Sequence, residues 1–214
     1  MSAGYEVLSI DELERYPSSS SYVLRPLRRR LGFRPFGVNV WVGENQGDEV
    51  IETHREPGGT EELYVVLRGT ASFTLGEETF DAPVGTLVHA PPGMLRAARA
   101  AQDGTTILAL GAEAGKAYEP AAWEDFYVAH AHLRAGDPER GRAAYREAIA
   151  REPDAWEGAY NAACFEALAG DRDAALAALQ RALELDRGQA MKYIATDSDL
   201  DSLRDDPRFA ELVR

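Results

Sequence analysis

The stretch that decides the fold begins at His54 and ends at Gly93. It opens with HREPGGTEELYVVLRG (54–69) and closes with GTLVHAPPG (85–93). Glycine and proline turns separate short apolar runs, which predict strands over 62–67, 71–75, 79–82 and 86–90. Further strands are expected over 36–42, 50–53 and 105–110. Short strands with a turn about every eight to twelve residues are typical of antiparallel barrels and sandwiches.

Two spacings in this stretch resemble the motifs of the cupin superfamily, whose members are small β-barrels that enclose a ligand or metal site. The first family motif reads G-x5-H-x-H-x(3,4)-E-x6-G, and Glu62 and Gly69 fit its E-x6-G half. The second reads G-x5-P-x-G-x2-H-x3-N, and Gly85, Pro91 and Gly93 fit its first half. The resemblance implies an antiparallel jelly-roll barrel whose motif residues point into its mouth.

The metal-binding positions of the two motifs are only partly kept. When the turn at 57–59 is aligned, His54 takes the place of the first histidine and Glu56 that of the second. Arg96 stands where the second motif has its histidine, and a protonated guanidinium cannot ligate a metal. In one interpretation, His54, Glu56 and Glu62 hold a divalent iron, manganese, zinc or nickel ion. In the other, which we prefer and in which no metal is bound, Arg96 pairs with Glu62 or Glu56.

Two further side chains complete the predicted ligand site. Tyr64 lies two residues from Glu62 on the same expected strand, so both should line the same cavity. His89 lies on the strand before Pro91 and faces either the cavity or the outside. The predicted ligand-binding residues are therefore His54, Glu56, Glu62, Tyr64, His89 and Arg96. No catalytic residue is assigned, because the sequence has no serine–histidine–aspartate set, phosphate loop or dinucleotide fingerprint.

The segment before the motifs predicts a short helix and a basic strand. Ser9 and Glu12 have the spacing of a capping box, which predicts a helix through Tyr16. Residues 22–31 carry several arginines. We interpret them as a solvated strand edge that discourages aggregation between sheets, with an anion site as the alternative.

The character of the chain changes between residues 111 and 120. Beyond this point alanine dominates, β-branched residues become rare, and the apolar period changes from two to three or four. We therefore predict two domains. A cupin β-barrel with an N-terminal arm occupies 1–115, and an α-helical module with a C-terminal cap occupies 120–214.

The helical part contains an internal repeat. Gly136-Asp137 recurs as Gly170-Asp171, a spacing of 34 residues, and small positions such as Gly141 and Ala175 recur with it. These features resemble tetratricopeptide repeats, which implies antiparallel helix pairs and a protein partner. Repeat stacks need a cap, and Pro207 is expected to begin the last short helix of that cap.

Composition limits the partners. The formal net charge of −13 argues against nucleic acid or an anionic membrane as the main partner, because phosphate binding needs clusters of basic residues. The single cysteine, Cys164, excludes an internal disulfide, fits a reducing cytoplasm and is expected to be a buried apolar side chain. No apolar run of transmembrane length and no signal-peptide pattern is present, so a cytoplasmic protein is expected.

Two other patterns look like metal sites and are rejected. His130 and His132 are two residues apart on an expected helix, so they point to different faces. The aspartates within 197–201 resemble the start of a calcium loop. However, Ser202 stands where that loop needs glycine, and Arg208 where it needs its bidentate glutamate.

Two classes of function stay open. In the first, the barrel binds or senses a small molecule at a degenerate metal site, and the helical repeats recruit a protein partner. In the second, the chain is a metal-dependent cupin enzyme of the dioxygenase or isomerase type with an unusual His/Glu ligand set. The resemblance also implies pairing of two copies through barrel edges, so a homodimer is expected.

Overall fold

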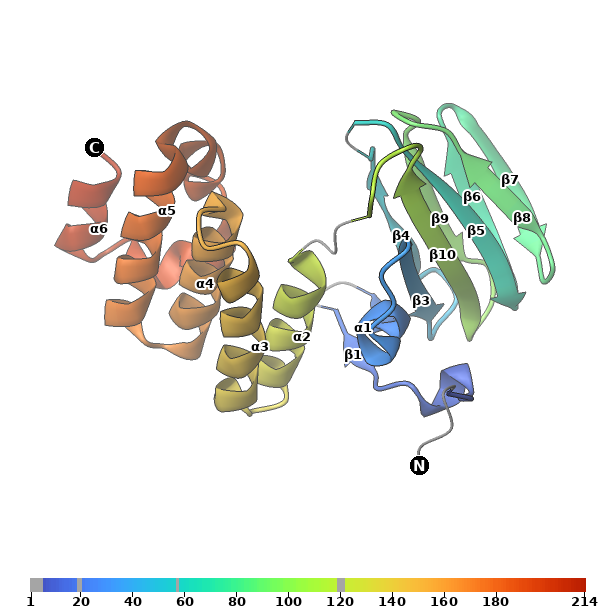
Figure 1. The fold of residues 1–214 in the computed structure, drawn as a ribbon, viewed down its shortest axis with the longest axis horizontal. Helices are drawn as coiled ribbons and strands as arrows, with labels where there is room; N and C mark the ends of the chain where they lie inside the picture. The colour runs from blue at the N-terminus through green and yellow to red at the C-terminus, as the bar shows by residue number, and fades with distance from the viewer. Residues whose placement is uncertain (1–5, 19–20, 57, 119–121) are drawn as a thin grey trace. The chain divides into compact units, whose positions relative to one another are not determined.

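The computed structural model describes residues 6–18, 21–56, 58–118 and 122–214. The chain divides into two compact units, Met1–Pro120 and Ala121–Arg214. In Figure 1 the first unit runs from blue to yellow-green and is built mainly of strands, and the second runs from yellow-green to red and is helical. The β + α fold class is therefore confirmed, whereas closure of the strands into a barrel stays a prediction.

The described part of the first unit contains two antiparallel β-sheets (Figure 1). The larger has the strand order β1-β2-β3-β10-β5-β8, and the smaller has the order β4-β9-β6-β7. All paired strands are antiparallel. Their bounds are β1 (Tyr16–Pro17), β2 (Tyr22–Arg25), β3 (Gly37–Gly43), β4 (Glu49–His54), β5 (Thr60–Arg68), β6 (Thr70–Leu75), β7 (Glu78–Pro83), β8 (Leu87–Ala90), β9 (Arg96–Ala100) and β10 (Thr105–Glu113).

One apolar core joins the two sheets. Alternation along β5 buries Tyr64 and Val66 and leaves Leu63 partly exposed, as expected when successive side chains face opposite sides of a sheet. The same core cluster contains Phe73 from β6 and Val50 from β4. Because these residues come from both sheets, the sheets pack face to face over this cluster.

The N-terminal segment differs from its sequence-based prediction. The capping box of Ser9 and Glu12 is present, but it caps only a short 3₁₀ helix, η1 (Ile10–Glu12). Residues 22–31 do not form one strand edge, because β2 is followed by helix α1 (Leu27–Leu31). Arg28, expected in solvent, is buried. Pro26 lies between the two elements and cannot donate to a continuing ladder, which explains why the strand ends there.

The second unit consists of helix pairs with matching junctions. Helix α2 packs against α3, and α4 packs against α5. In each pair a glycine with positive φ (Gly136 at 82°, Gly170 at 85°) precedes an aspartate. Asp137 and Asp171 then cap the next helix by accepting a hydrogen bond from a backbone N–H three residues on. The helices are α2 (Trp123–Arg134), α3 (Pro138–Arg151), α4 (Trp156–Ala169) and α5 (Arg172–Ile194).

Of the two C-terminal elements, the last helix begins where the sequence predicts. A 3₁₀ helix, η2 (Ser198–Leu203), follows α5, and α6 (Pro207–Leu212) starts at the predicted proline with Asp206 as its cap. Assignment of this unit to the tetratricopeptide class stays a prediction. Among the described residues no helix combines the length and apolarity that a membrane crossing needs.

Gly141 is a position at which the helix pairs approach closely. A Cβ built there would lie 2.6 Å from the Phe165 ring and 2.8 Å from the carbonyl oxygen of Ala129. We expect Gly141→Ala to destabilise the protein by about 1–3 kcal/mol in urea unfolding, although alanine is the better helix former. Gly158→Ala is the matched control, because its Cβ would meet Ile149 at an ordinary 3.4 Å. It should be neutral or stabilise by up to about 1 kcal/mol, and equal effects of the two variants would contradict the packing described.

Candidate ligand-binding site

Both sheets contribute to one polar cluster. His54 is the last residue of β4 and is paired in register with Arg96, the first residue of β9, in the smaller sheet. Glu62 and Tyr64 lie on β5 in the larger sheet, on the same face of the strand. Glu56 follows β4 by two residues. The structure thus brings five of the six predicted ligand-binding residues together.

The Glu62 carboxylate contacts three of the other side chains in this cluster. The Tyr64 hydroxyl donates a short hydrogen bond to Glu62 Oε2. Nε2 of His54 lies 3.5 Å from the same oxygen and 3.4 Å from Oε1 of Glu56. On the other side, Nε of Arg96 also lies 3.5 Å from Glu62 Oε2. One carboxylate oxygen therefore has a phenol, an imidazole and a guanidinium around it.

Arg96 forms the buried base of the cluster. Its side chain is 0% exposed, and its Nη2 donates to the carbonyl oxygen of Pro91 at 3.1 Å. Its Nε and Nη1 are buried and have no hydrogen-bond acceptor among the described residues. Glu62 is 14% exposed, whereas His54 and Glu56 are about twice as exposed, at 32% and 28%. The cluster is thus sealed at Arg96 and open to solvent at His54 and Glu56.

The electrostatics of the cluster favour a charged imidazole. Hydrogen bonds to Glu56 and then to Glu62 raise the pKa of His54 to about 10, against the opposing effect of burial. The same contact with His54 lowers the pKa of Glu56. Burial, followed by the charge of Glu62, raises the pKa of Tyr64, so this phenol keeps its proton. Two cations, His54 and Arg96, therefore balance two carboxylates, Glu56 and Glu62, at neutral pH.

The same residues include donors that a divalent cation can use. One ligand atom from each of His54, Glu56 and Glu62 lies within 4.8 Å of the others, and imidazole with carboxylates suits iron, manganese and zinc. Those three residues would hold the ion, which would act as a Lewis acid toward an oxygen atom of a ligand. Arg96 opposes such an ion, because its buried guanidinium places a positive charge beside the Glu62 carboxylate.

His89 lies apart from the cluster. Its strand neighbour on β5 is Leu63, and its Nε2 lies 2.9 Å from Oε2 of Glu61. Glu61 faces the opposite side of β5 from Glu62, because successive side chains alternate across a strand. The His89 side chain is 57% exposed. Of the two orientations that the sequence left open, the structure therefore shows the outward one.

The helical unit contains a second group that sequence reasoning missed. Cys164 is buried as predicted, but its Sγ lies 3.5 Å from Oδ2 of Asp197, which also accepts a hydrogen bond from the Tyr160 hydroxyl. Burial and the charges of Asp197 and Asp199 raise the pKa of the thiol, so it stays protonated and unreactive. No pattern could have linked residues so far apart in the chain. Asp197 otherwise caps η2 by accepting from the Asp199 N–H, as a structural aspartate would.

No protein-family model and no curated protein matches this sequence. Solved structures do match, each over about half of the chain. They include a sugar phosphate isomerase from a cupin superfamily of Silicibacter pomeroyi, 19% identical, covering 50% of this chain and 76% of its own, with a TM-score of 0.44. A predicted oxalate decarboxylase from Thermotoga maritima is 15% identical and covers 50% and 97%, with a TM-score of 0.43. An RmlC-like cupin from Shewanella frigidimarina is 11% identical and covers 53% and 95%, with a TM-score of 0.40.

The Shewanella and Silicibacter structures are described as cupins, and all three structures are less than 25% identical to this chain with TM-scores below 0.5. Membership of this chain in the cupin superfamily therefore stays a prediction, based on the spacing of Glu62 with Gly69 and of Gly85, Pro91 and Gly93.

Removal of the Arg96 charge should be costly. Arg96→Met keeps an unbranched apolar stem but removes the buried cation beside Glu62, so urea unfolding should show a loss of about 3–5 kcal/mol. Arg99→Met on the same strand is the matched control, because Arg99 is 63% exposed and 4.0 Å from Glu49. It should cost about 1 kcal/mol or less. Equal losses for the two variants would show that Arg96 does not neutralise the cluster.

Proposed function

We propose that the sheet unit binds a small polar molecule at the cluster of His54, Glu56, Glu62, Tyr64 and Arg96, and that the helical unit binds a protein segment. One observation carries the first part. The cluster is sealed underneath by Arg96 and open to solvent at His54 and Glu56. A molecule that arrives from solvent meets the carboxylates of Glu56 and Glu62 and the imidazolium of His54, and Glu62 is held from below by the buried Tyr64 and Arg96.

The chemistry of the open side indicates the kind of ligand. Glu56 and Glu62 accept hydrogen bonds, and a charged acceptor pairs most strongly with hydroxyl and ammonium donors. We therefore expect a small molecule that carries several hydroxyl groups or an amine beside a hydroxyl. Because Arg96 supplies a permanent positive charge where the cupin-like motif has a histidine, binding in this proposal needs no metal.

A metal-dependent enzyme is the second candidate, and one observation favours it. His54, Glu56 and Glu62 gather three donor atoms of the type that divalent metals bind in proteins. In this alternative, of the dioxygenase or isomerase type, the ion would replace the proton on His54 and leave Arg96 as a neighbour of the Glu62 ligand. Pairing of two copies of the chain also stays a prediction.

The second part of the proposal concerns the helical unit. Its support is the repeated junction at Gly136-Asp137 and Gly170-Asp171, which produces two helix pairs of the same design. Stacked helix pairs present continuous surfaces to partners and are a common scaffold for protein binding. Binding at this unit and binding at the sheet unit are separate claims with separate tests.

Ligand binding at the sheet unit is testable with a panel of polyols and amino alcohols. We expect at least one compound to raise the melting temperature of the full chain, because ligands that bind only the folded state stabilise it. Glu56→Gln should weaken that compound's binding by about tenfold or more, since hydrogen bonds to charged groups contribute about 1.5–3 kcal/mol. Glu61→Gln removes the same charge from the outward face of β5 and should leave binding unchanged. A panel without any shift, or equal binding by both variants, would contradict the proposal.

Metal content distinguishes the two candidates. We expect the protein, purified without a metal-affinity tag, to contain far less than one equivalent of iron, manganese, zinc or nickel, and to melt at the same temperature with and without chelator. Arg96→His removes the opposing charge and adds an imidazole, so this variant should gain zinc or nickel that raises its melting temperature reversibly. Stoichiometric metal in the unmodified protein, with melting that falls on chelation, would favour the enzyme.

A further inference from the structure

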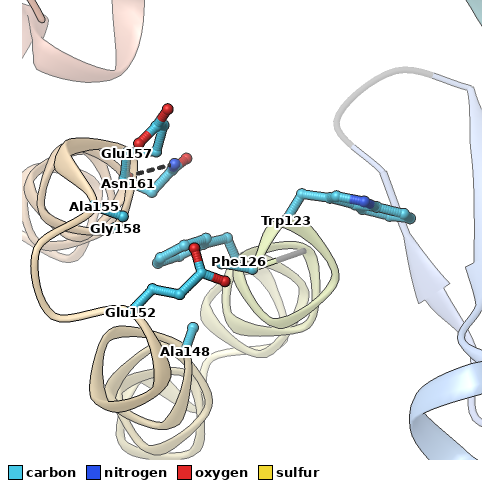
Figure 2. Close-up of a pocket in the computed structure, with 9 residues that line it drawn as sticks. Trp123, Phe126, Ala148, Glu152, Ala155, Glu157, Gly158 and Asn161 are labelled. Atoms are coloured by element: carbon cyan, nitrogen blue, oxygen red, sulfur yellow. Dashed lines mark hydrogen bonds between the residues drawn. The ribbon is translucent and has the colours of Figure 1, made fainter. Parts of the chain in front are cut away.

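The helical unit contains a pocket of about 330 Å³ where the end of α3 and the start of α4 face α2 (Figure 2). Its apolar lining includes Phe126 of α2, Ala148 of α3 and Gly158 of α4. In Figure 2 the Phe126 ring points toward the connection between α3 and α4, whereas the Trp123 indole extends from α2 in another direction. The pocket therefore has an aromatic wall and is kept open by small residues on the two facing helices.

Acidic side chains line the same pocket. Glu152 follows the last residue of α3, and Glu157 lies in the first turn of α4. Both are exposed, and neither forms an ion pair within the part of the chain that the structure describes. Asn161 is tied to the helix, because its Nδ2 donates to the backbone carbonyl of Glu157 at 2.8 Å.

Two arginines close in sequence or space to these glutamates form ion pairs with other carboxylates. Arg151, the residue before Glu152, pairs with the buried carboxylate of Asp125. Arg181 of α5 pairs with Asp154, at 3.3 Å. Within the described residues, neither Arg151 nor Arg181 thus pairs with Glu152 or Glu157, and a positively charged group from another molecule would complement these two carboxylates.

We propose that this pocket binds an arginine or lysine side chain of an extended segment in a partner protein. The volume lies at the small end of the range of about 300–1,000 Å³ for ligand pockets, which suits one long side chain. The apolar stem would rest on Phe126, Ala148 and Gly158, with the cation near the aromatic ring and the two carboxylates. This inference rests on the protein-binding part of the proposed function and names the chemistry of its partner.

The test uses the full chain and a short fluorescein-labelled peptide with a central arginine flanked by leucine and alanine. The same peptide with citrulline keeps the shape and removes the charge. By fluorescence anisotropy at low salt, the arginine peptide should bind about tenfold or more tightly than the citrulline peptide, and the difference should shrink as salt is added. Equal affinity of the two peptides, or no binding of the arginine peptide, would overturn the proposal.

Matched variants locate the binding. The double variant Glu152→Gln/Glu157→Gln should bind the arginine peptide about tenfold or more weakly and the citrulline peptide with unchanged affinity. Circular dichroism should show that its helicity is unchanged. Glu77→Gln/Glu78→Gln removes two exposed charges from the sheet unit and should have no effect. Spermidine is the small-amine competitor, and displacement of the peptide by equimolar spermidine would show a site for free amines and contradict a protein partner.

The outcomes separate this inference from the wider proposal. If the double variant binds the arginine peptide as tightly as the unmodified protein does, the assignment to this pocket is overturned. The helical unit would still be a protein-binding module. The melting-temperature response to polyols and amino alcohols, measured on the same double variant, should match that of the unmodified protein. Failure of the proposal for the sheet unit would therefore be seen in the melting temperature and not in peptide binding.

Discussion

The convergence of Tyr64, His54 and Arg96 on the carboxylate of Glu62 is the interaction on which the polar site depends. It ties β5 of one sheet to β4 and β9 of the other, so the two sheets and the site are specified together. A buried arginine is costly unless it faces a carboxylate, and a carboxylate at this depth is costly unless it is paired. Arg96 and Glu62 therefore each reduce the free-energy cost of burying the other, and packing alone explains neither residue.

Much of the fold could be predicted because the conformation favoured by neighbouring residues is the one found in the structure. Alternation along β5 places Glu62 with Tyr64, and the Gly136-Asp137 junction ends one helix and caps the next within two residues. Pro207 begins the last helix for the same kind of local reason. Features decided within a few neighbouring residues are readable from the sequence.

Features that depend on contacts between residues far apart in the sequence could not be predicted in the same way. Strand β9 was not predicted, because its run of alanine and arginine has no strand signature until β4 and β6 pair with it. Arg28 is buried although two further arginines follow it directly, and Asp197 contacts Cys164, which lies 33 residues earlier in the chain. His89 was ambiguous because its orientation depends on the register of β8 against β5, which places it opposite Leu63.

The most direct test of the central claim is a nitrogen-15 NMR titration of the His54 imidazole in the full chain, assigned by comparison with His54→Gln. If two carboxylates and Arg96 form the cluster as described, both ring nitrogens stay protonated through neutral pH and the ring titrates with a pKa of about 10. A ring that titrates near its ordinary value of about 6.5, or one that is neutral at pH 7 with the nitrogen shift of a metal ligand, would contradict the account.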